Sequence, residues 1–403
     1  MKSISATRRT SKSNHFIHFG CWNRGGCDLH SEAPNSLTRV MRTLNRSKPD
    51  FITVCGDNYY PDKLEDKDKD KVKDKDKDKD KTKDGEKKDK EKKKDKDGDG
   101  KKKKVKLVST EELKSGFNCL PKNIPIYMSY GNHDLETGLV VDGLEENTCK
   151  LTTIEMMTAT ERKNINLSLF QHIWFGNKNL IIMLETSLYD NVEPDKITLL
   201  EKCYGVVDSN IHSLDEMHEL QMNYVRSLIP DISRAYNIIV IGHHPLAYLK
   251  YKKNTVIRET LQGGMFDILK EIKINSQPGA SFYYLCADYH QYTEGTVVVN
   301  SSASASAHFN MTIHQYIVGT GGATIDSAVM EEYREHKETD YNVPGDADEY
   351  NVSYIMTEDN INNTVLDNGY LVVKRTSDNK IQCKFVNAMN MKSGSKSRRK
   401  QQK

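Results

Sequence analysis

Five short polar clusters carry the residue types that bind metal ions, and each follows an apolar run. They are Gly20-Cys21-Trp22-Asn23, Gly56-Asp57-Asn58-Tyr59-Tyr60, Gly131-Asn132-His133-Asp134, Gly242-His243-His244-Pro245 and Asp288-Tyr289-His290. Carboxylate, amide and phenol oxygens and imidazole nitrogens are common ligands of divalent and trivalent metals. A glycine lets the backbone turn sharply and stay close to a ligand. One such cluster alone is better explained as a turn, but four or five in one chain, each after a predicted strand, indicate a metal site.

The apolar runs before these clusters predict the strands that must position them. They span residues 15–20, 50–55, 124–129, 237–241 and 281–286. In open α/β sheets, ligands bind beyond the carboxyl ends of the strands, because loops from adjacent strands converge there. The five polar clusters are therefore expected to meet at one edge of a sheet.

Hydrophobic periodicity predicts the remaining elements. Helices are expected over 34–47, 110–120, 215–228 and 263–274, and further strands over 179–185, 296–299, 314–318, 352–356, 371–374 and 381–385. Alternating strands and helices in the first half predict a sheet covered by helices. The strand-rich end of the chain suggests a second sheet packed on the first. The expected class is α+β or α/β, with two packed mixed sheets flanked by helices.

The chain has 403 residues, and its charge is concentrated in one segment. Residues 62–104 contain 21 Lys and 16 Asp or Glu, with almost no side chain to bury. Such a segment cannot offset its ordering entropy and is expected to be disordered. We expect a single domain over 15–388, interrupted by this insertion. A basic N-terminus (1–14) and a basic C-terminal tail (389–403) are also expected to be disordered.

The sequence favours a soluble intracellular protein. It has no run of 18 apolar residues to span a membrane, and the first residues lack the apolar part of a secretory signal. Eight scattered cysteines without a CxxC pair indicate a reducing compartment and no disulfide framework. The basic tail is compatible with a nuclear signal. Nucleic-acid binding is disfavoured because Asp alternates with Lys in the insertion, and the sequence does not fix an oligomeric state.

The order of the polar clusters resembles a known family. GDNYY, GNHD, GHHP and a final C-x-x-x-H are similar to the motifs of the calcineurin-like metallophosphoesterases. GCWN, GDNYY, GHHP and VGTGGA (Val318–Ala323) are most similar to the small purple, tartrate-resistant acid phosphatases. The resemblance covers roughly residues 15–325. Without the insertion, Asp57 and Asn132 are separated by 32 positions in sequence number, which is similar to the family's usual interval.

The resemblance implies a four-layer α/β sandwich that holds two metal ions, here iron, zinc or manganese. Asp57 would bridge the two metals. Tyr60 and His290 would bind the first metal, and Asn132 and His243 would bind the second.

The resemblance also implies an acid-phosphatase-like phosphomonoesterase. A hydroxide bridging the metals would attack phosphorus in line, and His133 would protonate the leaving group. His244 would contact the substrate, which would be a small phosphate ester or a phosphoprotein.

Two positions depart from the family pattern. Cys21 replaces a metal-binding aspartate, and Asp288 stands where the family has a histidine. Both residues can bind metal, and a Cys21 thiolate would favour zinc over ferric iron. Asp28, in the D-x-H triplet that ends at His30, offers an alternative register for the first motif. A degenerate relative with a binding or structural role is the alternative function.

Overall fold

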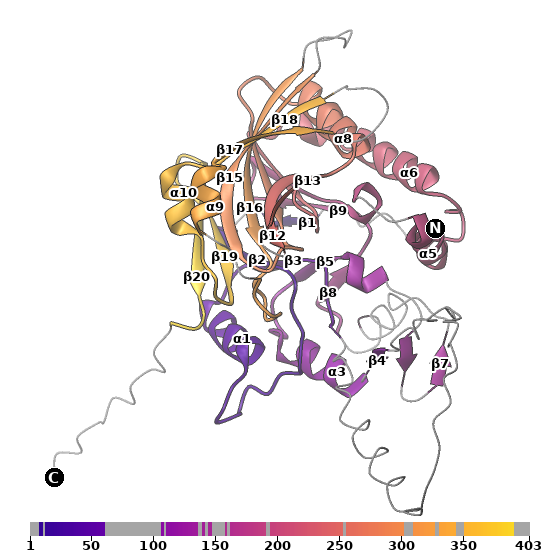
Figure 1. Cartoon of the computed structure of the whole chain (residues 1–403), viewed down its shortest axis with the longest axis vertical. Helices are drawn as coiled ribbons and strands as arrows, with labels where there is room; N and C mark the ends of the chain where they lie inside the picture. The colour runs from indigo at the N-terminus through magenta and orange to yellow at the C-terminus, as the bar shows by residue number, and fades with distance from the viewer. Residues whose placement is uncertain are drawn as a thin grey trace, which may run out of the picture.

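The strands of the computed structural model form two large sheets and two small ones (Figure 1). The structure describes residues 8–10, 13–60, 106–108, 110–135, 139–141, 144–146, 158, 162–190, 194–252, 255–301, 309–326, 330–343 and 350–390. The nine-stranded sheet has the order β1 (Arg8–Thr10), β9 (Gln171–Phe175), β10 (Asn179–Met183), β11 (Asn237–Ile241), β14 (Ser281–Cys286), β16 (Asn310–Val318), β15 (Tyr292–Ser301), β18 (Tyr350–Ile355) and β17 (Glu338–Asn342).

The second large sheet has six strands. Their order is β20 (Ile381–Asn387), β19 (Gly369–Arg375), β2 (His15–Phe19), β3 (Phe51–Cys55), β5 (Ile126–Ser129) and β8 (Ile165–Leu167). The small sheets are the hairpin of β12 (Ala247–Lys252) and β13 (Thr255–Thr260), and the group of β4 (Lys106–Val108), β6 (Leu139–Val141) and β7 (Leu144–Glu146).

A core of aromatic and aliphatic side chains fills the space between the two large sheets. Phe16 and Phe51 stack with ring centroids 4.8 Å apart, and Phe175 from the other sheet meets both rings edge-on. Successive side chains of a strand point to opposite faces of the sheet. The central strands are apolar at successive positions, so both of their faces pack against apolar side chains. On β10, Ile181 packs in this core, whereas Leu180 packs on the opposite face.

Helices cover the outer faces of both sheets. They are α1 (Ser36–Ser47), α3 (Thr110–Cys119), α5 (Pro194–Val207), α6 (Leu214–Ser227), α7 (Ile229–Ile232), α8 (Gly263–Ile274), α9 (Met330–Glu335) and α10 (Glu358–Asn363), with short 3-10 turns η1 (Asn132–Leu135) and η2 (Ser187–Tyr189). Buried residues of α1 and α3 belong to the core of the six-stranded sheet. Those of α6 and α8 belong to the core on the outer face of the nine-stranded sheet. The expected four-layer α/β sandwich is confirmed.

Local sequence explains where α1 begins and ends. The side chain of Asn35 caps its first turn by accepting a hydrogen bond from the backbone N–H of Thr38 at 2.8 Å. Leu37, Val40 and Leu44 recur at helical spacing and are buried. Lys48 ends the helix in the left-handed conformation, with φ of 44°.

The expected separate sheet at the C-terminal end is wrong. β17 and β18 extend the nine-stranded sheet, whereas β19 and β20 extend the six-stranded sheet through β2. The segment 1–14 was expected to be disordered, yet its residues Arg8–Thr10 form β1 and pair in parallel with β9. The insertion 62–104 and the tail from residue 391 lie outside the described residues.

The expectation of no disulfide is also wrong. Cys27 and Cys119 form a disulfide across 92 positions of sequence, with Cα atoms 6.3 Å apart, and Cys203 is disulfide-bonded as well. The fold brings the loop after Cys21 against the end of α3, a contact that no short motif reveals. The inference of a reducing compartment therefore loses its basis. Among the described residues, no helix is both long and apolar enough to cross a membrane.

Candidate metal centre

The carboxyl ends of parallel strands from both large sheets meet at one edge of the molecule. β2, β3 and β5 run parallel in one sheet, and β10, β11 and β14 run parallel in the other. Backbone hydrogen bonds continue into the loops: Cys21 donates to the carbonyl of Gly56 at 3.2 Å, and Ala287 donates to that of His243 at 2.8 Å. The polar clusters are thereby joined, as the motif positions predicted.

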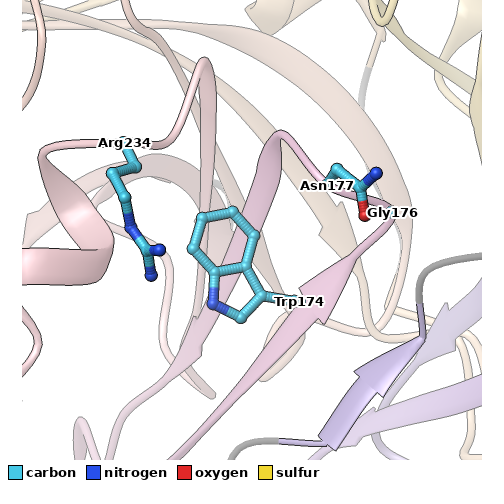
Figure 2. Close-up of a pocket in the computed structure, with 4 residues that line it drawn as sticks. All are labelled: Trp174, Gly176, Asn177 and Arg234. Carbon is cyan, nitrogen blue, oxygen red and sulfur yellow. The ribbon is translucent and has the colours of Figure 1, made fainter.

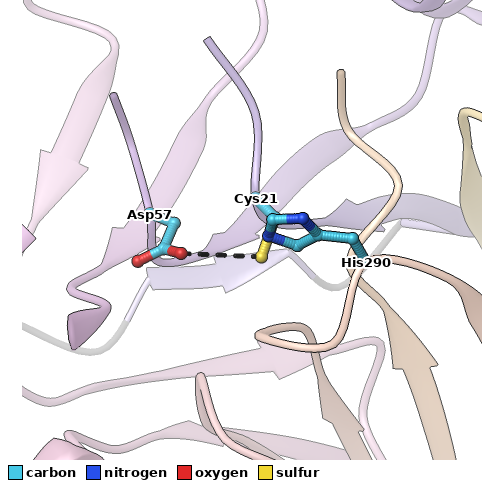
Figure 3. Close-up of side chains that lie close together, drawn as sticks. All are labelled: Cys21, Asp57 and His290. Atoms are coloured by element: carbon cyan, nitrogen blue, oxygen red, sulfur yellow. Dashed lines mark hydrogen bonds between the residues drawn. The ribbon is translucent and has the colours of Figure 1, made fainter. Parts of the chain in front are cut away.

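Two groups of ligand-type side chains lie side by side at this edge. The first cluster is Cys21, Asp57, Tyr60 and His290, and the second cluster is Asn132, His243, His244 and Asp288. The ligand atoms of Cys21, Asp57 and His290 lie within 4.8 Å of one another (Figure 3). The same limit holds for His243, His244 and Asp288.

Backbone strain is concentrated at three of these positions. Cys21, Asp57 and Asp288 have φ of 49°, 51° and 52°. Such values are uncommon for residues with a Cβ and cost free energy, so they persist where the surrounding structure enforces them, often at functional sites. Each of the three lies two residues beyond the end of a strand, and the tight turn directs its side chain into the site.

The carboxylate of Asp57 lies between the two clusters. Its Oδ2 accepts hydrogen bonds from the Tyr60 hydroxyl and from the Cys21 thiol, the latter at 3.8 Å. Its Oδ1 lies 3.3 Å from Nε2 of His243 and accepts the backbone N–H of His133 at 3.0 Å. Each oxygen of the carboxylate therefore faces one cluster.

Oxygen atoms also converge on His243 in the second cluster. Its Nε2 lies 3.2 Å from Oδ1 of Asn132 and 3.7 Å from Oδ1 of Asp288, in addition to the contact with Asp57. One nitrogen and three oxygens thus surround a small space, and oxygen and imidazole ligands suit borderline or hard cations.

Both metal-type histidines are oriented by backbone carbonyl groups. Nδ1 of His243 lies 2.7 Å from the carbonyl of Cys55, and Nδ1 of His290 lies 2.7 Å from that of Thr324. A carbonyl oxygen only accepts, so Nδ1 carries the proton in each ring. In the neutral ring, Nε2 then keeps a lone pair aimed into the cluster, as metal ligation requires. The residues present therefore have the donor types and ring orientations that metal ligation requires.

Burial and neighbouring charges set the protonation of the site. Burial and the charges of Asp57 and Asp288 raise the pKa of the Cys21 thiol, and burial followed by Asp57 raises the pKa of Tyr60. For Asp57, burial acts upward, but the charges of His243 and His133 outweigh it and lower the pKa. Burial opposes the charge on His243, yet Asp57 raises its pKa to about 10. A bound cation would instead lower the pKa of a coordinating thiol and deprotonate it.

A buried network holds three of the motifs together. Asp134 accepts hydrogen bonds from the backbone and side-chain N–H groups of Asn58, at 2.9 and 2.8 Å, and from the backbone of Gly131 at 3.0 Å. Trp22 donates to the side chain of Asn58 at 3.1 Å. Asp134 is therefore used as a structural anchor within the GNHD motif.

The solvent side of the site is formed by the GNHD motif. Asn132 is exposed and His133 is half-buried. The ring of His133 lies 5.0 Å from that of Tyr60, centroid to centroid. A substrate can therefore approach the clusters past His133.

The alternative register for the first motif receives no support. Asp28 accepts the backbone N–H of His30 at 2.8 Å, in a turn of its own loop, and belongs to neither cluster. The VGTGGA segment instead packs on the Cys21 motif, because the backbone N–H of Gly321 donates to Gly20 at 3.0 Å.

Several residues of the site carry no motif and were not predicted. Thr186 follows β10 and contacts His243 and His244. Asp326 accepts the backbone N–H of His290 at 3.0 Å. Thr186 belongs to a polar run that directly follows a buried strand, and this position was the feature of the sequence that could have identified it.

A pocket of about 310 Å³ lies at the other end of the parallel strands. Trp174, Gly176, Asn177 and Arg234 line it (Figure 2). Gly176 and Asn177 connect β9 to the start of β10, whereas Thr186 lies beyond the end of β10. This pocket is therefore separate from the candidate metal centre.

The fold and the clustered ligand-type side chains are those of a metal-dependent phosphoester hydrolase. A comparison with known protein families agrees. The sequence model of the calcineurin-like phosphoesterase family matches residues 15–292, more than half of the chain. The chain belongs to this family. No curated protein matches the sequence.

Proposed function

We propose that the chain is an acid-phosphatase-like phosphomonoesterase that uses two metal ions. The observation that supports this most strongly is the placement of Asp57, whose Oδ2 faces Cys21 and Tyr60 while its Oδ1 faces His243. A carboxylate in this position can be shared by two cations.

Each cation has its own set of protein ligands in this proposal. Cys21, Tyr60 and His290 would hold the first together with Asp57. Asn132 and His243 would hold the second, also together with Asp57, and Asp288 would lie beside it. When bound, the metal pair supplies Lewis acidity to the phosphoryl oxygens and a nucleophile at neutral pH.

His133 is the proposed general acid. The oxygen of a water molecule that has given one proton to solvent bonds to phosphorus as the bond from phosphorus to the alcohol oxygen breaks. The departing alkoxide takes a proton from His133, which solvent then reprotonates. The products are the alcohol and inorganic phosphate, without a covalent enzyme intermediate. The backbone N–H of His133 on Asp57, at 3.0 Å, fixes this residue relative to both clusters.

The exposed side of the site supports small phosphomonoesters or phosphoproteins as substrates. Asn132 is exposed and His133 half-buried, so a phosphate group on a larger molecule can reach them. The hairpin of β12 and β13 begins two residues after Pro245 and so directly follows His243 and His244 in the sequence. We propose that it borders the substrate.

Metal content and hydrolysis measured on the same sample test the proposal. The purified full chain should hold two metals and hydrolyse a chromogenic phosphomonoester faster than the matching phosphodiester. A sample with two bound metals that leaves the monoester intact would contradict the proposed activity.

One observation favours a second candidate, a degenerate member with a binding or structural role. The Cys21 thiol is fully buried, and its raised pKa disfavours the thiolate in the absence of a cation. Elemental analysis separates the two candidates, because the degenerate protein would bind one metal or none and would show no turnover.

A further inference from the structure

Thr186 occupies a buried position behind the second cluster. It lies three residues beyond the end of β10, and neither it nor His243 has measurable exposure. A Cβ on Gly242 would lie 2.5 Å from the Thr186 methyl group and 2.3 Å from the hydroxyl of Tyr284. Only glycine at position 242 therefore lets the GHHP turn approach Thr186 this closely.

The hydroxyl of Thr186 contacts three nitrogen atoms. It accepts the backbone N–H of His243 at 3.0 Å and that of His244 at 3.1 Å. It also lies 3.1 Å from Nδ1 of His244. A hydroxyl has two lone pairs and one hydrogen. The two backbone groups use both lone pairs, so the hydrogen is donated to Nδ1 of His244.

This bond fixes the proton of the His244 ring. Nδ1 accepts, so in the neutral ring the proton is on Nε2. His243 and His290 have the opposite arrangement, because carbonyl groups accept from their Nδ1 atoms. The Nδ1 partners thus divide the three rings in their neutral forms. His243 and His290 then present a lone pair at Nε2, and His244 presents an N–H.

Nε2 of His244 has no hydrogen-bond partner among the described residues, although the residue is only 2% exposed. Oδ2 of Asp190 lies 3.8 Å away, beyond hydrogen-bond distance. Asp288 and His243 are the other polar side chains clustered with His244. A buried N–H without a partner has lost its hydrogen bond to water, and a phosphate oxygen would restore that bond on binding.

We infer that Thr186 is a positioning residue that holds His244 as the Nε2–H tautomer, so that His244 donates a hydrogen bond to the phosphate ester and does not bind metal. The proximity of His244 to His243 and Asp288 would otherwise suggest that His244 also binds the metal of the second cluster. The inference rests on the proposed function for the identity of the ligand. The tautomer itself follows from the contacts of Thr186.

Nitrogen-15 NMR of histidine-labelled, zinc-loaded full chain tests the tautomer without turnover. His244, assigned by its loss in His244→Gln, should show an unprotonated Nδ1 and a protonated Nε2. His243 and His290 should show protonated Nδ1 atoms and serve as internal references. A proton on Nδ1 of His244, or zinc at its Nε2, would overturn the inference.

Two substitutions at Thr186 distinguish positioning from packing. Thr186→Ser keeps the hydroxyl and should keep the wild-type tautomer. Thr186→Val keeps the shape but removes both the donor to Nδ1 of His244 and the acceptor of the two backbone N–H groups. It should mix the tautomers and lower kcat/KM on the order of 10- to 100-fold, as loss of an orienting partner does. If Thr186→Val does not fold, the spectra of the wild type and of Thr186→Ser still show which nitrogen of His244 carries the proton.

Metal content supplies an independent readout. His244→Gln should retain the wild-type zinc stoichiometry, whereas a lost zinc would show that His244 is a ligand and overturn the inference. An inactive protein with the expected tautomer would remove the proposed function and leave the role of Thr186 intact. An active protein with the opposite tautomer would do the reverse.

Discussion

The first cluster, which contains Asp57, and the second cluster, which contacts it, differ in ligand chemistry and in exposure. The first cluster contributes sulfur and a phenol oxygen, and Cys21 and Tyr60 are buried. The second cluster contributes amide and carboxylate oxygens with imidazole nitrogen, and its Asn132 is exposed. Soft thiolate ligands favour zinc, whereas oxygen ligands favour harder ions. We therefore expect the first cluster to select the metal and the second to face the substrate.

Loss of Asp57 should have the largest effect because both clusters share it. Asp57→Asn keeps the shape but removes the negative charge, so we expect metal content to fall at both positions and hydrolysis to fall to background. Elemental analysis and the phosphomonoester assay measure the two effects. Asp28→Asn, in a loop outside both clusters, is the matched control. Wild-type turnover in Asp57→Asn would exclude the shared-carboxylate account.

Replacement of His133 should lower the rate of hydrolysis without changing the metal content. His133→Ala should lower kcat on the order of 10²–10⁴-fold, as loss of a general acid does, with both metals retained. The loss should be larger for an alkyl phosphate than for a nitrophenyl phosphate, whose leaving group needs less protonation. An equal loss for both substrates would indicate that His133 has a different role.

Changes at Cys21 should affect the first cluster alone. Cobalt-loaded wild-type protein should show a sulfur-to-cobalt charge-transfer band that Cys21→Ser lacks. Cys21→Asp should shift the preference of this cluster from zinc towards iron, and ferric iron bound to Tyr60 would give a visible colour. Competition loading followed by elemental analysis measures the shift. Identical cobalt spectra for wild type and Cys21→Ser would show that the thiol is not a ligand.

The disulfide should contribute stability with the smallest effect on chemistry. Cys27 and Cys119 connect the loop after the first cluster to the end of α3. Replacing both with Ser should lower the free energy of unfolding by about 2–5 kcal/mol, because a long loop of the unfolded chain is no longer closed. Urea unfolding without reductant measures this, with Cys383→Ser, a free thiol, as control. An unchanged unfolding free energy would mean that the bond does not form in solution.

The sequence predicted the buried strands and the motif loops more reliably than the rest of the fold. The ranges of β11, β14 and α8 agree with the predicted ones, because long apolar runs and helical spacing leave little choice. β9 and the hairpin of β12 and β13 were not predicted, since polar and aromatic residues interrupt their patterns. The C-terminal strands could not be assigned to a sheet, because pairing with β2 depends on contacts more than 350 positions apart.

The same difference holds within the site. Residues in glycine-led motifs, such as Asp57 and His243, could be found from type and spacing. Thr186 acts through a single hydroxyl, and Cys27 acts through a partner 92 positions away. The polar run after β10 marks the position of Thr186 but not its partners, and Cys27 leaves no local pattern, so only the folded arrangement identifies their roles.

Anomalous X-ray diffraction from crystals of the metal-loaded protein tests the central claim most directly. The account predicts two metal peaks, one within each cluster, with one oxygen of Asp57 directed at each. A single peak, or none beside Asp57 in protein that hydrolyses a phosphomonoester, would contradict it.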